Sequence, residues 1–205
     1  MKPYPSIARS VGQDFREFEA YVFDKLDGSN LRVEWSRKQG WHKFGTRKRL
    51  FDETDEVFAE AIPLFRSTLA DGVEKVARDE RWDRLTIFME FWGKQSFAGD
   101  HVPGDPKFLT LFDVNPYKQG ILGPKQFLDL FEHLAIPKML GRLKWTRGFV
   151  ERVRLGQVEG ITEEGVVGKA GTRHELVMAK AKTQVWIDKV LAKYGMEAGQ
   201  KIVNS

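Results

Sequence analysis

The feature that most constrains the fold is a lysine followed by a glycine turn between two apolar segments, Lys25-Leu26-Asp27-Gly28-Ser29-Asn30. Residues 21–23 predict a strand that enters the turn. Residues 31–35 alternate between apolar and polar side chains, which predicts a strand that leaves it, so the two strands are expected near a hairpin. Lys25 should therefore lie at the rim of a sheet, where a lysine amine with a lowered pKa can act as a nucleophile.

Further along the chain, apolar residues at helical spacing alternate with segments rich in branched and aromatic residues. Helices are expected at residues 55–69, 73–81, 124–134 and 184–194. Strands are expected at residues 85–92, 108–114, 165–169 and 175–182. Pro63 should kink or bound the first helix, and the loop at residues 93–106 is a candidate mobile lid.

Size and composition favour one domain over residues 1–205. The chain has 41% hydrophobic residues and six tryptophans, enough for one substantial core, and it has no internal repeat or linker. We expect an α+β fold of mostly antiparallel β-sheets flanked by helices. No apolar run approaches the roughly 20 residues of a membrane span, and the start lacks the apolar core of a signal peptide. The sequence thus predicts a soluble, cytoplasmic protein that binds no membrane.

The absence of cysteine excludes disulfide frameworks and thiolate zinc sites, and the four scattered histidines form no metal-ligand pattern. Any metal must therefore be held by oxygen ligands. This favours Mg²⁺ or Mn²⁺, which carboxylates, phosphates and water bind.

A net charge of +4 and a pI near 9.2 suit a polyanionic partner. Basic residues gather among aromatic ones in residues 37–49 and 138–154, a pattern that suits phosphate contacts and base stacking. Either cluster alone fits a solvated surface equally well. The candidate nucleic-acid-binding residues are Arg37, Lys38, Lys48, Arg49, Arg142, Lys144 and Arg147.

Four later segments complement the lysine turn chemically. They are Phe88-Met89-Glu90-Phe91, Leu111-Phe112-Asp113-Val114, Glu164-Gly165-Val166-Val167-Gly168-Lys169 and Lys180-Ala181-Lys182. Glu90 lies among large apolar residues, where a carboxylate without a partner would be costly to bury. Lys180 and Lys182 would face the same side of a strand, which is tolerable where an anion lies between them. Each segment alone also has an ordinary interpretation: a surface turn, an ion-paired edge residue, a core phenylalanine or an exposed lysine pair.

Taken together and in this order, the segments resemble the motifs of the covalent nucleotidyltransferases, the family of ATP-dependent RNA and DNA ligases and mRNA capping enzymes. The resemblance implies a ligase-type nucleotidyltransferase domain of ATP-grasp-like architecture. Ser29 and Asn30 match RNA ligases, whereas DNA ligases commonly have an arginine near that point. The segment after Lys182 is too short to encode an oligonucleotide-binding (OB) barrel, so we expect a minimal form without one.

The same resemblance implies ATP as co-substrate, Mg²⁺ or Mn²⁺ as cofactor, and Lys25 as the nucleophile that carries AMP. By the resemblance Glu90 binds the ribose, Phe112 stacks on adenine, and Glu164 is the leading metal ligand, with Glu90 as another; Glu163 is second choice to Glu164. Lys169 either contacts phosphate or caps its strand. The candidate ATP-binding residues are Lys25, Asp27, Asn30, Arg47, Glu90, Phe112, Lys180 and Lys182.

The expected activity is therefore sealing of 5′-phosphate and 3′-hydroxyl ends in nicked or broken RNA, or in an RNA/DNA hybrid, by a monomeric ATP-dependent RNA ligase. A minimal ATP-dependent DNA ligase is the nearest alternative, and the missing barrel disfavours a capping guanylyltransferase. A catalytically silent nucleic-acid-binding protein with this fold is the alternative from another class.

Overall fold

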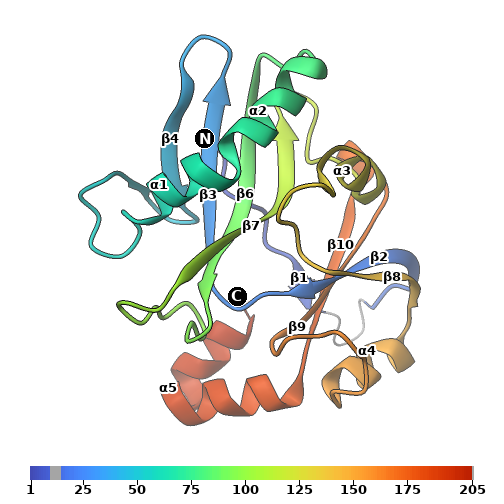
Figure 1. Cartoon of the computed structure of the whole chain (residues 1–205). Helices are drawn as coiled ribbons and strands as arrows, with labels where there is room; N and C mark the ends of the chain where they lie inside the picture. The colour runs from blue at the N-terminus through green and yellow to red at the C-terminus, as the bar shows by residue number, and fades with distance from the viewer. Residues whose placement is uncertain (10–14, 205) are drawn as a thin grey trace. The chain divides into compact units, whose positions relative to one another are not determined.

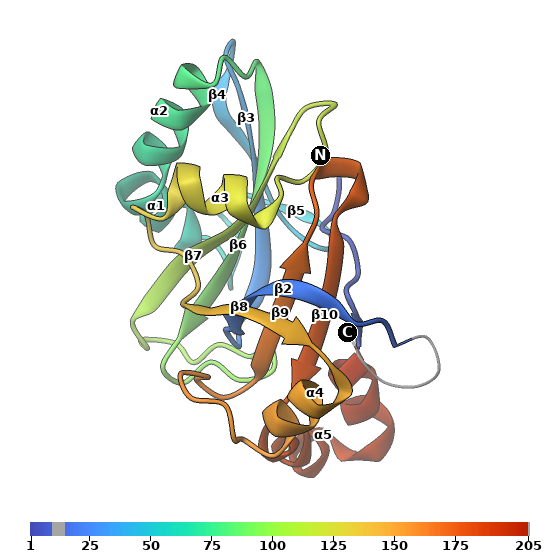
Figure 2. The ribbon, with the colours of Figure 1, turned by 90° about the vertical axis from the view of Figure 1, so that its right-hand side faces the viewer.

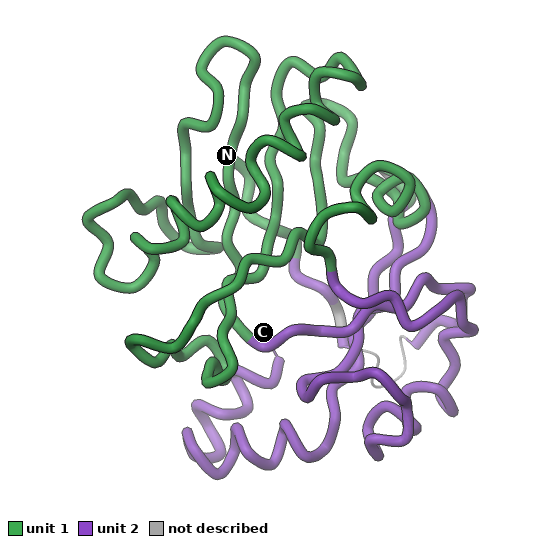
Figure 3. The backbone as a smooth tube through the Cα atoms, viewed as in Figure 1, with its two compact units in different colours: residues 1–5, 28–136, 172–175 green, residues 6–27, 137–171, 176–205 purple. Residues whose placement is uncertain are grey.

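The computed structural model describes residues 1–9 and 15–204 of the chain. Within these residues it contains five α-helices and two open five-stranded sheets, which confirms the expected α+β class with mostly antiparallel sheets. The chain packs as two compact units, shown in Figure 3. Unit 1 comprises residues 1–5, 28–136 and 172–175, and unit 2 comprises residues 6–27, 137–171 and 176–205. Each unit is described by itself below.

Unit 1 holds an antiparallel sheet with the strand order β5-β4-β3-β6-β7. Its strands are β3 (Ser29–Ser36), β4 (Gly40–Thr46), β5 (Leu50–Phe51), β6 (Arg84–Gly93) and β7 (Lys107–Pro116). Its helices are α1 (Ala61–Thr68), α2 (Ala70–Asp79) and α3 (Pro124–Phe131), with a 3₁₀ turn at Arg173–Glu175. Figure 1 shows α1 and α2 over one face of the sheet. Alternate residues of β3 and β6 face the helices and form a core with buried side chains such as Trp35, Phe65 and Phe127.

Unit 2 holds the sheet β1-β10-β9-β2-β8, in which only the β1–β10 pair is parallel. Its strands are β1 (Ala8–Arg9), β2 (Phe18–Lys25), β8 (Met139–Trp145), β9 (Gly165–Ala170) and β10 (Val177–Lys182). Its helices are α4 (Arg147–Arg154) and α5 (Gln184–Asn204). As Figure 2 shows, α4 lies beside β8 and β9. Buried Val22, Trp145, Phe149 and Val166 form the core on this face of the sheet.

The strand that enters the lysine turn and the strand that leaves it do not form the expected hairpin. β2 pairs with β8 and β9, whereas β3 pairs with β4 and β6, so the turn after Lys25 connects two different sheets. Local alternation predicts each strand but carries no information about which strand becomes its partner. Lys25 is nevertheless the last residue of β2 and lies at a strand end as expected.

The helix expected at residues 55–69 begins only at Ala61, so Pro63 lies in its first turn, where a missing N–H costs little. The last helix continues to Asn204 but breaks at Gly195, where φ is +77°, just after the predicted end at residue 194. The sequence did not predict strands β4 and β8 or helix α4. Basic residues dominate these segments and obscure the periodic spacing of their apolar residues. None of the described helices has the length and apolar character that a membrane span requires.

Candidate active site

Three neighbouring strand ends of unit 2 bring the central candidate residues together. Gly165, the first residue of β9, lies opposite Lys25 of β2 on one side and opposite Lys182 of β10 on the other. A Cβ atom at Gly165 would lie 2.0 Å from the carbonyl oxygen of Ala181, and the residue has a φ of +148°. Glycine is therefore required for the two lysine-bearing strands to flank β9 this closely.

Glu164 lies between the two lysines. Its carboxylate accepts a hydrogen bond from Lys25 Nζ at 2.7 Å and is 2.9 Å from Lys182 Nζ. Glu164 and Lys182 are buried, whereas the Lys25 side chain is 23% exposed. A buried carboxylate is stable here because each of its oxygens has a cationic partner.

The charges of this cluster shift the pKa values of its members. Burial raises the pKa of Glu164, but the charges and hydrogen bonds of Lys25 and Lys182 outweigh burial and hold it below its ordinary value. Burial lowers the pKa of Lys182, and the positive charge of Lys25 lowers it as well. The negative charge of Glu164 raises it but does not outweigh these effects. Glu164 is therefore ionised at neutral pH, and Lys182 loses its proton more readily than an ordinary lysine.

The same face of the sheet continues with further cations. Lys180 lies two residues before Lys182 on β10, opposite Val167, and is buried. Lys169 is also buried, and its ammonium lies over the Phe23 ring, 5.5 Å from the ring centre. These positions extend the positive face along the strands away from Lys25.

Glu163, the second-choice metal ligand, points elsewhere. Its carboxylate pairs with Lys189 of α5 and is 41% exposed. The neighbouring acids thus differ in environment: Glu164 joins the lysine cluster, and Glu163 makes a surface ion pair.

Unit 1 brings a second group of candidates together. Asn30 of β3 and Glu90 of β6 are direct cross-strand partners, so their side chains share a face of the sheet. The Asn30 amide oxygen is buried and has no hydrogen-bond partner among the described residues. Because such an atom normally finds a partner, this face suits a polar ligand.

Phe112 lies outside the hydrophobic core of unit 1, at the irregularity where β7 shifts its register against β6. The Tyr4 ring meets it edge-on, with 5.1 Å between ring centres, and Tyr4 also donates a short hydrogen bond to Asp113. Burial, together with the nearby Asp113 carboxylate, raises the pKa of Tyr4 well above its ordinary value. Phe112 is thus half-buried and packs on Tyr4, and base stacking stays a prediction.

The candidate basic residues of the segment 37–49 lie at the two ends of β4, while Lys43 lies within the strand and pairs with Glu34. Arg37 and Lys38 lie in the turn before β4, whereas Arg47, Lys48 and Arg49 follow it. A strand of seven residues spans roughly 20 Å, so this segment does not form one patch. Arg47 and Lys48 are exposed, and Arg49 pairs with Asp55.

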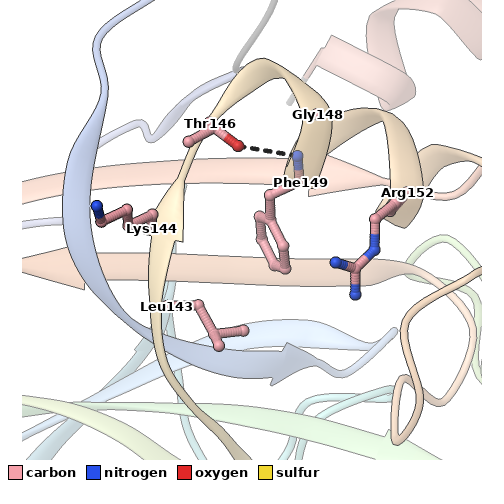
Figure 4. A pocket seen from close by; sticks show the side chains of 6 residues that line it. All are labelled: Leu143, Lys144, Thr146, Gly148, Phe149 and Arg152. Carbon is pink, nitrogen blue, oxygen red and sulfur yellow. Dashed lines mark hydrogen bonds between the residues drawn. The ribbon is translucent and has the colours of Figure 1, made fainter.

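In unit 2 the basic candidates Arg142, Lys144 and Arg147 are exposed on β8 and at the start of α4. A pocket of about 410 Å³ lies beside them, lined by Leu143, Lys144, Thr146, Gly148, Phe149 and Arg152. In Figure 4 Phe149 and Arg152 point from α4 toward Leu143, while Lys144 extends to the other side of the strand. The pocket lining thus includes two cationic side chains, Lys144 and Arg152.

No group of three His, Asp or Glu side chains within residues 1–9 and 15–204 is placed to hold a metal ion. The two predicted metal ligands, Glu164 and Glu90, belong to different units.

Several residues with contacts to the site were not predicted. Asp24, next to Lys25, accepts a hydrogen bond from the Thr162 N–H at 3.0 Å, which ties the end of β2 to the segment before Glu164. Trp186 donates to Asp27, and Thr183 bonds the backbone of Glu163. Thr183 had a usable signal, because a threonine directly before a predicted helix is a common cap.

No model of a known protein family matches this sequence, and no curated protein matches it. Solved structures do match. A mutant form of Naegleria gruberi RNA ligase with ATP and Mn has a TM-score of 0.60 and 16% identity and covers 83% of this chain. The same ligase with PPi also has a TM-score of 0.60 and 16% identity, over 83% of this chain. An archaeal ATP-dependent RNA ligase has a TM-score of 0.61 and 16% identity over 93% of this chain.

The chain spans about half the length of these ligases, 51% of each. At this identity the likeness concerns the fold. The two sheets with their helices thus have the fold found in ATP-dependent RNA ligases.

Proposed function

We propose that this protein is an ATP-dependent RNA ligase that transfers AMP through a covalent bond to Lys25. The observation that carries the proposal is the contact of Lys25 with Glu164, which in turn contacts Lys182, at the ends of three adjacent strands. A lysine held at a strand end beside a buried carboxylate and a second lysine suits nucleophilic attack on a phosphate. The likeness in fold to RNA ligases supports the same activity.

In the proposed first step the Lys25 amine attacks the α-phosphorus of ATP, a nitrogen–phosphorus bond forms, and pyrophosphate leaves. The amine attacks in its unprotonated form, so a proton first passes from its ammonium to water. AMP then passes to a 5′-phosphate, and a 3′-hydroxyl displaces AMP to form the phosphodiester. Lys180 and Lys182 offset the negative charge on the α-phosphate during attack.

The remaining proposed nucleotide contacts follow from the resemblance to the covalent nucleotidyltransferases. Glu90 binds the ribose hydroxyls and Phe112 stacks on adenine, while Asp27, Asn30 and Arg47 complete the proposed ATP contacts. The orphaned oxygen of Asn30 supports a polar ligand on this face. Glu164 and Glu90 are the protein oxygens proposed for Mg²⁺ or Mn²⁺, whose bound form would offset phosphate charge.

The nucleic acid is proposed to be nicked or broken RNA, or an RNA/DNA hybrid, acted on by a monomer in the cytoplasm. The exposed cations of β8 and α4 support a polyanion on unit 2. The proposed phosphate contacts are Arg37, Lys38, Lys48, Arg49, Arg142, Lys144 and Arg147. The proposal treats residues 1–205 as one nucleotidyltransferase domain built from the two units.

The test is incubation with Mg²⁺ and ATP or GTP labelled at the α-phosphate. The proposal expects stable label from ATP but not from GTP, and none in Lys25→Ala. A panel of nicked duplexes with RNA or DNA on each side of the break then separates the ligases. A requirement for ribonucleotides at the 3′-hydroxyl side supports an RNA ligase, and equal sealing of all-DNA nicks supports a DNA ligase. No label from either nucleotide would support a silent nucleic-acid-binding protein.

A further inference from the structure

The first turn of α5 touches the lysine cluster at several points. The indole N–H of Trp186 donates to Asp27 Oδ2 at 2.6 Å. Asp27 belongs to the turn that begins at Lys25. Trp186 is only 1% exposed, so the indole end of this part-buried hydrogen bond is shielded from water.

The face of the same indole lies under Lys182. The Lys182 ammonium is 4.1 Å from the centre of the Trp186 ring, within the range of a cation–π contact. One side chain thus holds the turn after the nucleophile through its edge and the second lysine through its face.

The backbone around Trp186 reaches the carboxylate segment as well. Thr183 donates its hydroxyl to the carbonyl of Glu163 at 2.7 Å, and its N–H bonds the carbonyl of Glu164 at 3.0 Å. The same hydroxyl accepts a hydrogen bond from the backbone N–H of Trp186 at 3.2 Å. The beginning of α5 is therefore fixed to the segment that carries Glu164.

We propose that Trp186 is a positioning residue that sets the turn of Lys25 against Lys182 for adenylyl transfer. The inference rests on the proposed function and adds a residue that lies outside the five motif segments. Trp186 acts through Asp27 and Lys182. Because a misplacement of about 1 Å near the reacting atoms can cost about a hundredfold in rate, a clamp on both sides of the nucleophile has a large effect.

The experiment compares Trp186→Phe, which keeps a ring but removes the N–H, with Trp186→Leu, which removes both contacts. Trp145→Phe is the matched control, because Trp145 is also fully buried in unit 2 but packs on Phe18 and Phe149 in its core. Thermal unfolding of each variant shows that it is folded. The readouts are the rates of label transfer from ATP at limiting and at saturating ATP, which separate an effect on KM from an effect on kcat.

We expect kcat to fall about tenfold in Trp186→Phe and more in Trp186→Leu, with KM changed less than about threefold, because one charge-assisted hydrogen bond is lost first and the cation–π contact second. Asp27→Ala removes the acceptor, so adding Trp186→Phe to it should cost little more.

Equal kcat in Trp186→Phe and Trp145→Phe, with wild-type label transfer intact, would overturn this inference and leave the proposed function standing. Independent losses from Asp27→Ala and Trp186→Phe that add in the double variant would overturn it as well. Absence of label in the wild-type protein would overturn the proposed function and, with it, the role of Trp186.

Discussion

Replacing Glu164 with glutamine keeps the shape of the side chain and removes the negative charge between Lys25 and Lys182. In the wild type the two lysine nitrogens lie 2.7 and 2.9 Å from its oxygens, and Glu164 is 4% exposed. Breaking a buried ion pair costs about 3 to 5 kcal/mol, and glutamine can still accept one hydrogen bond. Since Lys25 is partly exposed, water compensates part of its loss. We expect Glu164→Gln to lower the free energy of unfolding by about 2 to 4 kcal/mol at pH 7.

The difference should depend on pH at both ends. The folded pKa of Glu164 is lowered, so its contribution is complete above its ordinary value of 4.5 and is lost as pH falls through the lowered pKa. At high pH the lysines lose their charge, earlier for Lys182 than its ordinary 10.5 because its folded pKa is lowered. The stability difference between wild type and variant should therefore form a plateau near neutral pH that declines in acid and in alkali.

Urea titrations at several pH values measure this difference. Glu163→Gln is the matched control, because it removes the adjacent acid from an exposed ion pair with Lys189 and should cost less than about 1 kcal/mol. Equal losses in the two variants, or a loss in Glu164→Gln that does not change with pH, would refute the electrostatic account of the cluster.

Three further substitutions test other parts of the structure. Gly165→Ala places a Cβ 2.0 Å from the carbonyl oxygen of Ala181, so it should cost more than about 3 kcal/mol in urea titration; a loss below about 1 kcal/mol would contradict the close strand packing. Tyr4→Phe removes the hydroxyl bonded to buried Asp113, so it should lower the free energy of unfolding by about 1 to 3 kcal/mol and with it the melting temperature. An unchanged melting temperature would contradict that bond. His101→Ala removes a ring whose nitrogens lie 2.9 and 3.1 Å from two serine hydroxyls, so trypsin should cut the loop after β6 several-fold faster. Burial lowers the pKa of His101, so the wild-type loop should also be cut faster as pH falls below 6.5. Cleavage that changes neither with His101→Ala nor with pH would show that His101 does not hold the loop.

The sequence predicts strands and helices best where one periodicity dominates. β6 and β7 have runs of branched and aromatic residues and were located within two residues of their ends. In β8, by contrast, Leu143 and Trp145 alternate with Arg142 and Lys144, and the basic residues hide a strand whose other side chains pack on α4. The sequence could not predict which strands pair with each other, because the partner of a strand is set by packing over the whole chain.

The candidate site divides in the same way. The order of the motifs and the period of two along a strand suffice to place Lys180 and Lys182 on one face, and β10 has this arrangement. The contact of Trp186 with Asp27 joins residues 159 positions apart, and that of Tyr4 with Asp113 joins residues 109 apart. No local pattern reports such contacts, because each joins residues that are far apart in the sequence.

The most direct test of the central claim is mass spectrometry of the protein after incubation with ATP and Mg²⁺, followed by fragmentation of its peptides. The account predicts one adenylate per chain, attached to the side-chain nitrogen of Lys25. Adenylate on another lysine, or a protein that stays unmodified while it seals nicked RNA with ATP, would contradict it.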